Sequence, residues 1–208
     1  MTQRILVIGA GGHAKVVIEA LRAAGFDPAG LIDPHPTSRE LLGVPLLGDD
    51  IALPRLRSDF PAAAIALGSN RARECIAETL RQLGYALPPI IHPAAYLSPS
   101  ATIGPGAVVM ARATIGTLAR IGALAILNTG CIVEHDNDIG ACAHIAPGAT
   151  LAGAVTVGPR ALVGAGAVAR PGVTIGADAI VGAGAAIVSD VPAGATWAGT
   201  PARPLRRA

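Results

Sequence analysis

Two histidines, His135 and His144, lie nine residues apart in the segment 126–149, where polar residues replace a glycine-rich pattern. Glu134 precedes the first histidine and Asp136 follows it. Histidine titrates near neutrality, so a neutral His135 could take a proton from an attacking amine or hydroxyl. A carboxylate on the other ring nitrogen would fix the tautomer, and either flanking acid could supply it. The segment therefore predicts a general base.

A glycine-rich turn, VIGAGGH at residues 7–13, forms a second candidate site between an apolar run and a helical pattern. Backbone N–H groups at such a helix start suit a phosphate. Gly9, Gly11 and Ala14 also satisfy a dinucleotide fingerprint, and Asp33 follows Gly9 by twenty-four residues. A lone fingerprint is weak, and about ninety residues are short for a full NAD-binding fold. A nicotinamide cofactor is therefore disfavoured.

Alternating strands and helices are expected over residues 1–88. The predicted strands are RILVI, PAGLIDP and AAAIALG, at residues 4–8, 28–34 and 62–68. Predicted helices follow the first and third strands, and Gly25 and Gly84 lie near their ends. The first helix should turn one face inward, made of Val16, Val17, Ala20, Leu21 and Ala24. This alternation favours a small parallel sheet.

From residue 97 onward the chain repeats every six residues. Fifteen of the sixteen positions from Leu97 to Ile187 are Leu, Ile or Val, and the exception is Ala169. A six-residue period means a short strand and a turn, and three units close a triangular coil of about eighteen residues. The aliphatic side chain and the small residue two positions earlier should both point inward. A collagen-like segment would repeat every three residues and is disfavoured.

Composition narrows the functional class. The net charge is +2, which gives no reason to expect nucleic acid as a partner. Three cysteines, Cys75, Cys131 and Cys142, form neither a disulfide framework nor a CxxC metal motif. No apolar run approaches a membrane span, and the first is too short for a signal-peptide core. We expect a cytoplasmic protein without membrane contact.

The motifs together resemble a known family. VIGAGGHAKVV, ALGSNRAR, IIHPAA, NTGCIVEHDNDIG and HIAPGA look like the sialic acid O-acetyltransferase family, which includes UDP-amino-sugar and perosamine N-acetyltransferases. The match covers essentially the whole chain. It implies a half-Rossmann-like α/β domain that binds a nucleotide sugar (1–88), a left-handed parallel β-helix (89–192) and a C-terminal tail (193–208). It also implies acetyl-CoA as co-substrate and a homotrimer with active sites between subunits.

The resemblance assigns roles to residues of the β-helix. It makes Asp136 the orienting partner of His135, and it places His144 near the thioester carbonyl of acetyl-CoA. Further acetyl-CoA contacts are implied at Gly153, Ala165 and Ala183. Pro201 and Arg203 would lie near the adenine end of the cofactor, and we expect Trp197 to cap the open end of the prism.

The family likewise implies a nucleotide site in the first domain. Gly11, Gly12 and His13 would meet the diphosphate, and Asp33 would contact the uracil or ribose. The motif GSNRAR would lie beside the same crevice, through Gly68, Asn70 and Arg73. The only lysine, Lys15, could add charge or lie solvated on its helix.

The expected reaction is acetyl-CoA-dependent N-acetylation of a nucleotide-linked deoxyamino sugar, without metal and without a covalent enzyme intermediate. Two alternatives are O-acetylation of sialic acid or a related sugar, and a non-catalytic nucleotide-sugar-binding trimer. A zinc site is disfavoured because His135 and His144 would lack a third ligand beyond the connector residue His92. The sequence leaves the carrier open among UDP, GDP and dTDP.

Overall fold

The computed structural model describes residues 3–205, and the chain divides into two compact units, Met1–Pro93 and Ala94–Ala208. The final arginines, Arg206 and Arg207, lie outside the described residues. Over residues 3–205, none of the helices has the length and apolar character that crossing a membrane requires.

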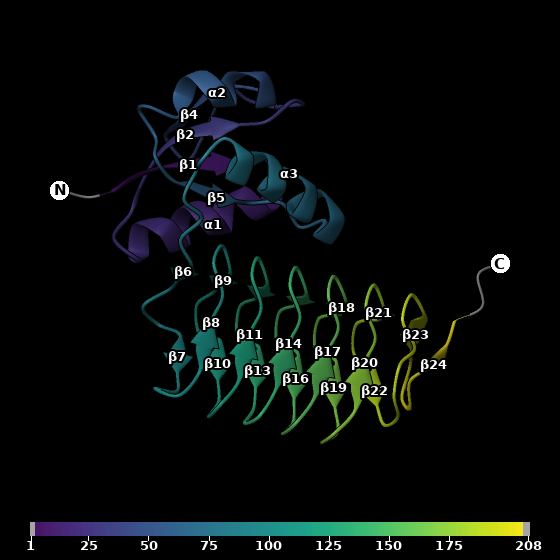
Figure 1. Ribbon diagram of the computed structural model, residues 1–208. Helices are drawn as coiled ribbons and strands as arrows, with labels where there is room; N and C mark the ends of the chain where they lie inside the picture. Colours follow the sequence, from purple (N-terminus) through teal and green to yellow (C-terminus); the bar gives the residue numbers. More distant parts are fainter. Residues whose placement is uncertain (1–2, 206–208) are drawn as a thin grey trace. The chain divides into compact units, whose positions relative to one another are not determined.

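The first unit is built on a five-stranded sheet (Figure 1). In spatial order its strands are β3 (Glu40–Leu41), β4 (Val44–Gly48), β2 (Asp27–Ile32), β1 (Arg4–Ile8) and β5 (Ala63–Ile65). All neighbours pair in parallel except β3 and β4, which form an antiparallel pair. The predicted parallel sheet is confirmed, and the carboxyl ends of β1, β2 and β5 meet at one edge.

Two longer helices accompany this sheet, α1 (Gly12–Ala23) and α3 (Asn70–Gln82), and the chain reaches Pro93 through β6 (Ile90–Ile91). The buried face of α1 is apolar and consists of Ala14, Val17, Ile18, Ala20 and Leu21. The prediction for Val16 was wrong, because its side chain is 41% exposed and Ile18 takes the inward place. Gly25 follows the helix with φ 84°, a left-handed conformation that favours glycine at a helix end.

The segment between β2 and β5 adds short elements that the sequence pattern did not predict. After the β3–β4 hairpin come a 3-10 helix, η1 (Asp50–Ala52), and one turn of α-helix, α2 (Leu53–Leu56). The carboxylate of Asp49 caps η1 by accepting from the backbone N–H of Ile51 at 3.0 Å. The buried hydroxyl of Tyr85 donates to the carbonyl of Leu53 at 2.7 Å and fastens this segment to the end of α3.

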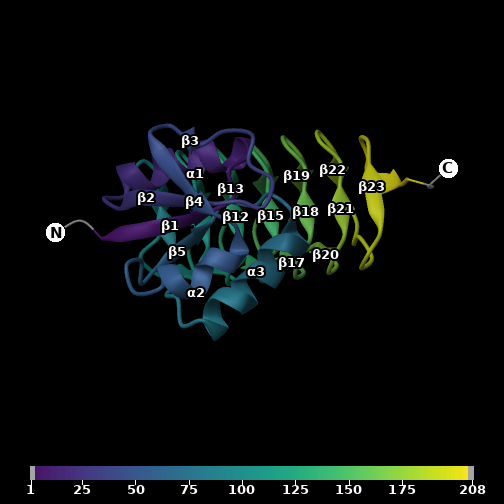
Figure 2. The ribbon, with the colours of Figure 1, turned by 90° about the horizontal axis from the view of Figure 1, so that it is seen from above.

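The second unit is the expected left-handed parallel β-helix of two-residue strands (Figures 1 and 2). The strands are β7 (Tyr96–Leu97), β8 (Thr102–Ile103), β9 (Val108–Val109), β10 (Thr114–Ile115), β11 (Arg120–Ile121), β12 (Ile126–Leu127), β13 (Ile132–Val133), β14 (Asp138–Ile139), β15 (His144–Ile145), β16 (Thr150–Leu151), β17 (Thr156–Val157), β18 (Leu162–Val163), β19 (Val168–Ala169), β20 (Thr174–Ile175), β21 (Ile180–Val181) and β22 (Ala186–Ile187). Every aliphatic of the six-residue period is the second residue of one strand, and from Val109 onward each is buried.

Strands eighteen residues apart stack in parallel and form the three faces of the prism. One face runs from β7 through β10, β13, β16 and β19 to β22, and the second runs from β8 to β20. The third face holds β9, β12, β15, β18 and β21. A residue therefore lies directly above the one eighteen positions earlier, as Thr150 does above Ile132.

The corners of the coils need glycine for two different reasons. Gly148 has φ 66°, the left-handed conformation expected for an Ala-Pro-Gly corner. Gly140, directly after an inward aliphatic, is instead required by close approach, because a Cβ there would lie 2.5 Å from the backbone nitrogen of Pro159. Backbones of neighbouring coils therefore meet closely at the corners.

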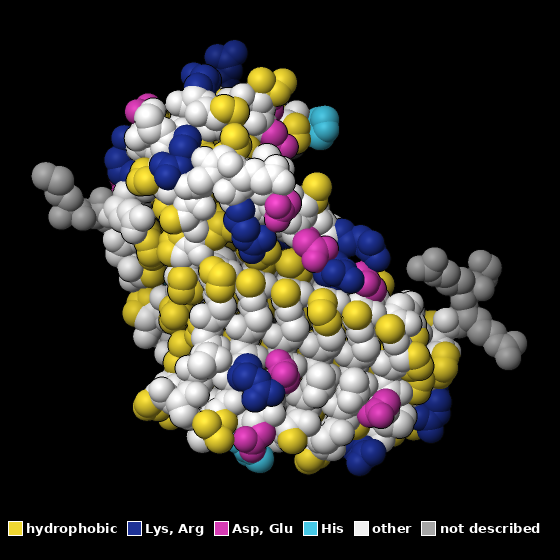
Figure 3. Space-filling view, viewed as in Figure 1, with side chains coloured by type: hydrophobic (Ala, Val, Ile, Leu, Met, Phe, Trp, Pro, Cys, Tyr) yellow, Lys and Arg dark blue, Asp and Glu magenta, His cyan; other side chains and the backbone are white. Residues whose placement is uncertain are grey.

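The β-helix ends in β23 (Thr196–Ala198), which continues the third face beside β21, and β24 (Arg203–Pro204), which pairs with β23 in antiparallel fashion. Trp197 lies opposite Val181 in this pairing, and its side chain stays partly exposed. The face of the β-helix in Figure 3 carries few charged side chains. One exposed ion pair on its strands joins Arg120 to Asp138 at 2.9 Å.

Candidate active site

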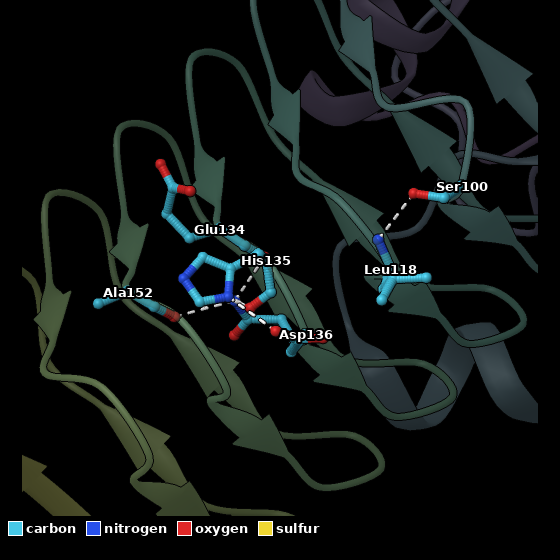
Figure 4. A network of polar contacts seen from close by, with 7 residues as sticks. Ser100, Leu118, Glu134, His135, Asp136 and Ala152 are labelled. Atoms are coloured by element: carbon cyan, nitrogen blue, oxygen red, sulfur yellow. Dashed lines mark hydrogen bonds and ion pairs between the residues drawn. The ribbon is translucent and has the colours of Figure 1, made fainter.

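His135 lies at a corner of the β-helix, between β13 and β14 (Figure 4). Its Nδ1 is 2.8 Å from Oδ2 of Asp136, and the two side chains are 60% and 53% exposed. Glu134 is on the same corner, but its side chain points away from the ring. Of the two flanking acids, Asp136 is thus the one that engages the imidazole.

This pairing defines what the ring can do. A carboxylate has only acceptor atoms, so Nδ1 is the donor and Nε2 of the neutral ring carries the lone pair. Asp136 has φ 59°, a left-handed conformation that Asp tolerates better than most residues. The corner therefore turns two consecutive side chains toward each other and leaves an exposed nitrogen base.

Gly153 stands one coil beyond His135, as its sequence phase predicted. A Cβ on Gly153 would lie 2.5 Å from Nε2 and 3.1 Å from Nδ1 of His135. The imidazole therefore lies directly against this glycine, and only glycine leaves room for it. The structure groups Gly153 with the predicted base, on the edge that follows β13 and β16.

His144 comes from another face of the prism, at the start of β15. Its Nε2 is 3.1 Å from the side-chain nitrogen of Asn128, whose Oδ1 accepts from the backbone N–H of Thr129 at 2.8 Å. This second bond orients the amide, so Asn128 donates to His144. Asn128 belongs to the polar segment 126–149, but it is not among the site residues predicted from the sequence. Asn128 lies one coil before Ala146, and Ala146 follows His144 by two residues. Stacking of the coils therefore brings Asn128 close to His144.

Ala165 and Ala183 follow β18 and β21, the next strands on the face that carries β15. Both alanines are exposed and lie one coil apart at the same edge. The backbone N–H of Gly184 donates to the carbonyl of Ala165 at 2.8 Å, which ties the two corners together. The structure thus places Ala165 and Ala183 on one edge of the prism, His144 on the face that leads to this edge, and Gly153 on another edge.

In the first unit, the glycine turn opens α1 with exposed backbone. Gly11 is the N-cap, and a Cβ on Gly11 or Gly12 would meet open space. Asp33, at the end of β2, braces this turn by accepting from the backbone N–H of Ala10 at 2.7 Å and from that of His35 at 2.8 Å. The first N–H groups of α1 are therefore presented on a fixed turn.

The residues of GSNRAR fall into an exposed part and a buried part. A Cβ on Gly68 would meet open space, whereas Arg73 is fully buried. The Arg73 guanidinium donates to the carbonyl of Leu67 at 2.9 Å and to Oδ1 of Asn70 at 2.8 Å. Burial and, secondarily, the positive charge of Arg73 lower the pKa of His13. Arg73 thus holds the turn between Leu67 and Asn70 by hydrogen bonds, and its charge disfavours the protonated form of His13.

A cavity of about 420 Å³ opens at the carboxyl ends of β1 and β2. Gly9 and Asp33 line it, as do residues that sequence reasoning did not single out, namely Pro34, Asp50, Leu67, Cys75 and Thr79. The last two face the cavity from α3. Of the lining residues named here, only Gly9 and Asp33 could be predicted from the sequence, because their place at the strand ends follows from the parallel sheet.

Other expected positions lie apart from these sites. Pro201 is exposed before β24, and Arg203 is exposed as the first residue of that strand. The Arg203 guanidinium donates to the carbonyl of Ala202 at 2.8 Å. Lys15 is exposed on α1. Within residues 3–205, His, Cys, Asp and Glu side chains form no group of three or more that could hold a metal ion.

The chain is similar to known proteins both in its first domain and over its whole length. Residues 4–80 match the PglD N-terminal domain family. A mutant of perosamine N-acetyltransferase from Caulobacter crescentus, solved with CoA and GDP-perosamine, is 46% identical, and the alignment covers 100% of this chain and 99% of that one with a TM-score of 0.96.

Two further solved structures align over nearly the whole length. The acetyltransferase domain of PglB from Neisseria gonorrhoeae, in complex with acetyl coenzyme A, is 41% identical over 99% of this chain and 100% of that one, with a TM-score of 0.94. WeeI from Acinetobacter baumannii is 28% identical over 98% and 100% of the two chains, with a TM-score of 0.84.

Proposed function

The chain belongs to the hexapeptide-repeat sugar acetyltransferases, and we propose that it transfers the acetyl group of acetyl-CoA to the amino group of a nucleotide-linked deoxyamino sugar. The observation that carries the proposal is the exposed His135 imidazole, with Asp136 on Nδ1 and Gly153 against the ring. The solved relative with CoA and GDP-perosamine supports this class of substrates.

In this reaction, the amine nitrogen attacks the thioester carbonyl carbon and forms a C–N bond. His135 takes the amine proton on Nε2, while the Asp136 carboxylate stabilises the imidazolium that results. The tetrahedral intermediate then collapses, the C–S bond breaks, and the proton passes from His135 to the departing thiolate of CoA. The products are the acetamido sugar nucleotide and CoA, and no covalent enzyme intermediate is formed.

We assign His144 to the thioester carbonyl, where a ring N–H would stabilise the negative charge that develops on oxygen. Asn128 supports this role because it fixes the ring. The pantetheine arm of the cofactor would run along the edge of Ala165 and Ala183, whose small exposed side chains leave the backbone accessible. Gly153 would lie at the acetyl end of the cofactor, beside the base.

The nucleotide carrier is assigned to the first unit. The exposed start of α1 at Gly11 and Gly12 is suited to the diphosphate, because helix N-termini attract anions. His13 and the buried charge of Arg73 lie behind it. The base and ribose would occupy the cavity at Asp33, with Gly68 and Asn70 beside them.

We also propose a homotrimer, which the arrangement of the two edges supports. The base lies on the edge after β13, whereas His144 begins β15, and Ala165 and Ala183 lie on the edge after β18 and β21. Packing three prisms around an axis would bring the first edge of one subunit to the second edge of its neighbour. The exposed His135 would then be completed by a partner subunit. We place the enzyme in the cytoplasm, where its cysteines would stay reduced.

The test is CoA release measured with acetyl-CoA and a panel of acceptors, namely GDP-, UDP- and dTDP-linked amino sugars and free sialic acid. The proposal predicts turnover with nucleotide-linked amino sugars and an acetamido product. Turnover only with free hydroxylated sugars would favour the O-acetyltransferase alternative. Absence of thiol release with every acceptor would favour a binding protein without catalysis.

A further inference from the structure

Asn137 is a polar residue at a position that the fold reserves for small apolar ones. It lies two residues before the inward aliphatic Ile139, and its side chain is fully buried. The equivalent inward positions on neighbouring strands hold Ala125, Cys131, Ala143, Ala149, Val155 and Ala161. We propose that Asn137 is a positioning residue that fixes the His135 imidazole, an inference that rests on the proposed role of His135 as the base.

The amide nitrogen of Asn137 joins two stacked corners, those that hold Glu134 and Ala152, which are both labelled in Figure 4. It donates to the carbonyl of Glu134 at 2.7 Å and to that of Ala152 at 2.9 Å, with a longer contact of 3.4 Å to the carbonyl of His135. Glu134 directly precedes the base, and Ala152 directly precedes the glycine that faces its ring. One side chain therefore fixes both the residue that carries the imidazole and the surface against which it lies.

These bonds replace a regular feature of the coil. At other corners the backbone N–H of the inward small residue donates to the carbonyl three residues earlier, as Cys131 does to Asn128 at 3.0 Å and Ala143 does to Gly140 at 3.2 Å. Among the described residues, Ala95, Asn137, Val155 and Val173 make no such backbone bond. The carbonyls three residues before Asn137 and Val155, those of Glu134 and Ala152, accept from the Asn137 side chain instead. The corner at His135 thus has a hydrogen-bond pattern of its own.

The β-helix does not need an amide side chain at position 137. The Oδ1 atom of Asn137 is buried and, within residues 3–205, meets no hydrogen-bond donor. A buried acceptor without a donor is destabilising, and the small apolar residues elsewhere show that the coil folds without it. The contribution of Asn137 is therefore local, at the two corners that hold His135.

The test compares Asn137→Ala with Val173→Ala, which removes an inward side chain two coils away on the same stacked line. We expect Asn137→Ala to lower kcat by about ten- to a hundredfold, because small displacements of a base are costly, while the KM values for both substrates change less than about twofold. Val173→Ala should keep the wild-type kcat even where its thermal stability matches that of Asn137→Ala. Equal losses of kcat in the two variants, or no loss in Asn137→Ala, would overturn the proposal.

A second readout does not depend on turnover. In full-length protein labelled with ¹³C-histidine, the Cε1–Hε1 signal of His135 is assigned with His135→Gln. Asn137→Ala should shift and broaden this signal, whereas Val173→Ala should leave it in place. An unchanged signal in Asn137→Ala would contradict positioning. If the wild-type protein lacks turnover while the signal shifts as expected, then the proposed function fails and the structural role of Asn137 stands.

Discussion

Asp136 accepts a hydrogen bond at 2.8 Å from Nδ1 of its immediate neighbour, His135. Adjacent residues of a strand point to opposite faces, so this contact exists only because Asp136 lies at a corner with φ 59°. The left-handed backbone folds its carboxylate back onto the ring. The geometry of the coil thereby selects Asp136 over Glu134 as the partner of the base.

Removing this carboxylate should slow the reaction without weakening binding. We expect Asp136→Ala to lower kcat by about ten- to a hundredfold, because the imidazolium loses its counter-charge and the ring loses its orientation. Steady-state kinetics with the preferred acceptor measures this effect. Glu134→Ala is the matched control, since its side chain points away from the ring, and it should keep a kcat near wild type. Equal kcat values in the two variants would refute the assignment of Asp136.

A methyl group on Gly153 should displace the base. Because a Cβ there would overlap the imidazole, Gly153→Ala is expected to reduce kcat by about a hundredfold while the β-helix stays folded. Gly194→Ala serves as the control, since its Cβ would meet open space and its only penalty is a φ of 69°. That variant should lose stability but little kcat. The prediction fails if Gly153→Ala turns over at the wild-type rate.

Cysteine labelling can test the nucleotide cavity without kinetics. Cys75 is exposed and lines the cavity, whereas Cys131 and Cys142 are buried. Burial raises the pKa of Cys131 to about 12, so its thiol should stay unreactive at neutral pH. Native protein should therefore react with N-ethylmaleimide at Cys75 only, as mass spectrometry of peptides would show. Bound nucleotide sugar should slow this reaction several-fold, and an unchanged rate would argue against the cavity as its site.

A negative charge at the start of α1 should repel the diphosphate. We expect Gly12→Asp to raise the KM for the nucleotide sugar by about tenfold or more, while the KM for acetyl-CoA stays the same. Ala23→Asp places the same charge at the other end of α1 and should leave both KM values near wild type. Equal effects of the two substitutions on the nucleotide-sugar KM would contradict a phosphate site at this turn.

Acid should destabilise the protein in part through His13. Its folded-state pKa lies below the ordinary value of 6.5, mainly because of burial and also because of the charge of Arg73. As pH falls through about 6.5, the unfolded chain binds a proton that the folded chain resists, so stability is lost toward the folded-state pKa. The urea midpoint should therefore drop more between pH 7.5 and 5.5 in wild type than in His13→Gln. Equal drops would contradict this account.

Most of the β-helix could be predicted because its period is a geometric necessity. Each aliphatic from Leu97 to Ile187 ends one strand, since a six-residue unit leaves one inward large side chain per face. The corner glycines have two separate causes. Gly148 needs a positive φ, but Gly140 is required by the backbone of the next coil. The hairpin β3–β4 and the helices η1 and α2 have no such periodicity and were not predicted.

The sequence predicted those features of the site that depend on single residues. The type of His135 and its polar neighbours pointed to a base, but the contacts that hold it join residues of different coils. Asn137 reaches Ala152, fifteen residues away, and Asn128 reaches His144, sixteen residues away. Arg73 looked like a ligand contact from its motif, yet it shares the buried face of α3 with Ala77 and Leu80. Which side of a helix faces inward depends on packing that the motif does not contain.

The most direct measurement of the central claim is the single-turnover rate of acetyl transfer in His135→Ala, with Glu134→Ala beside it. We expect His135→Ala to lose about a hundredfold or more of the transfer rate, while both variants keep the wild-type fold and bind acetyl-CoA equally well. A transfer rate in His135→Ala equal to that of Glu134→Ala would show that this imidazole is not the base.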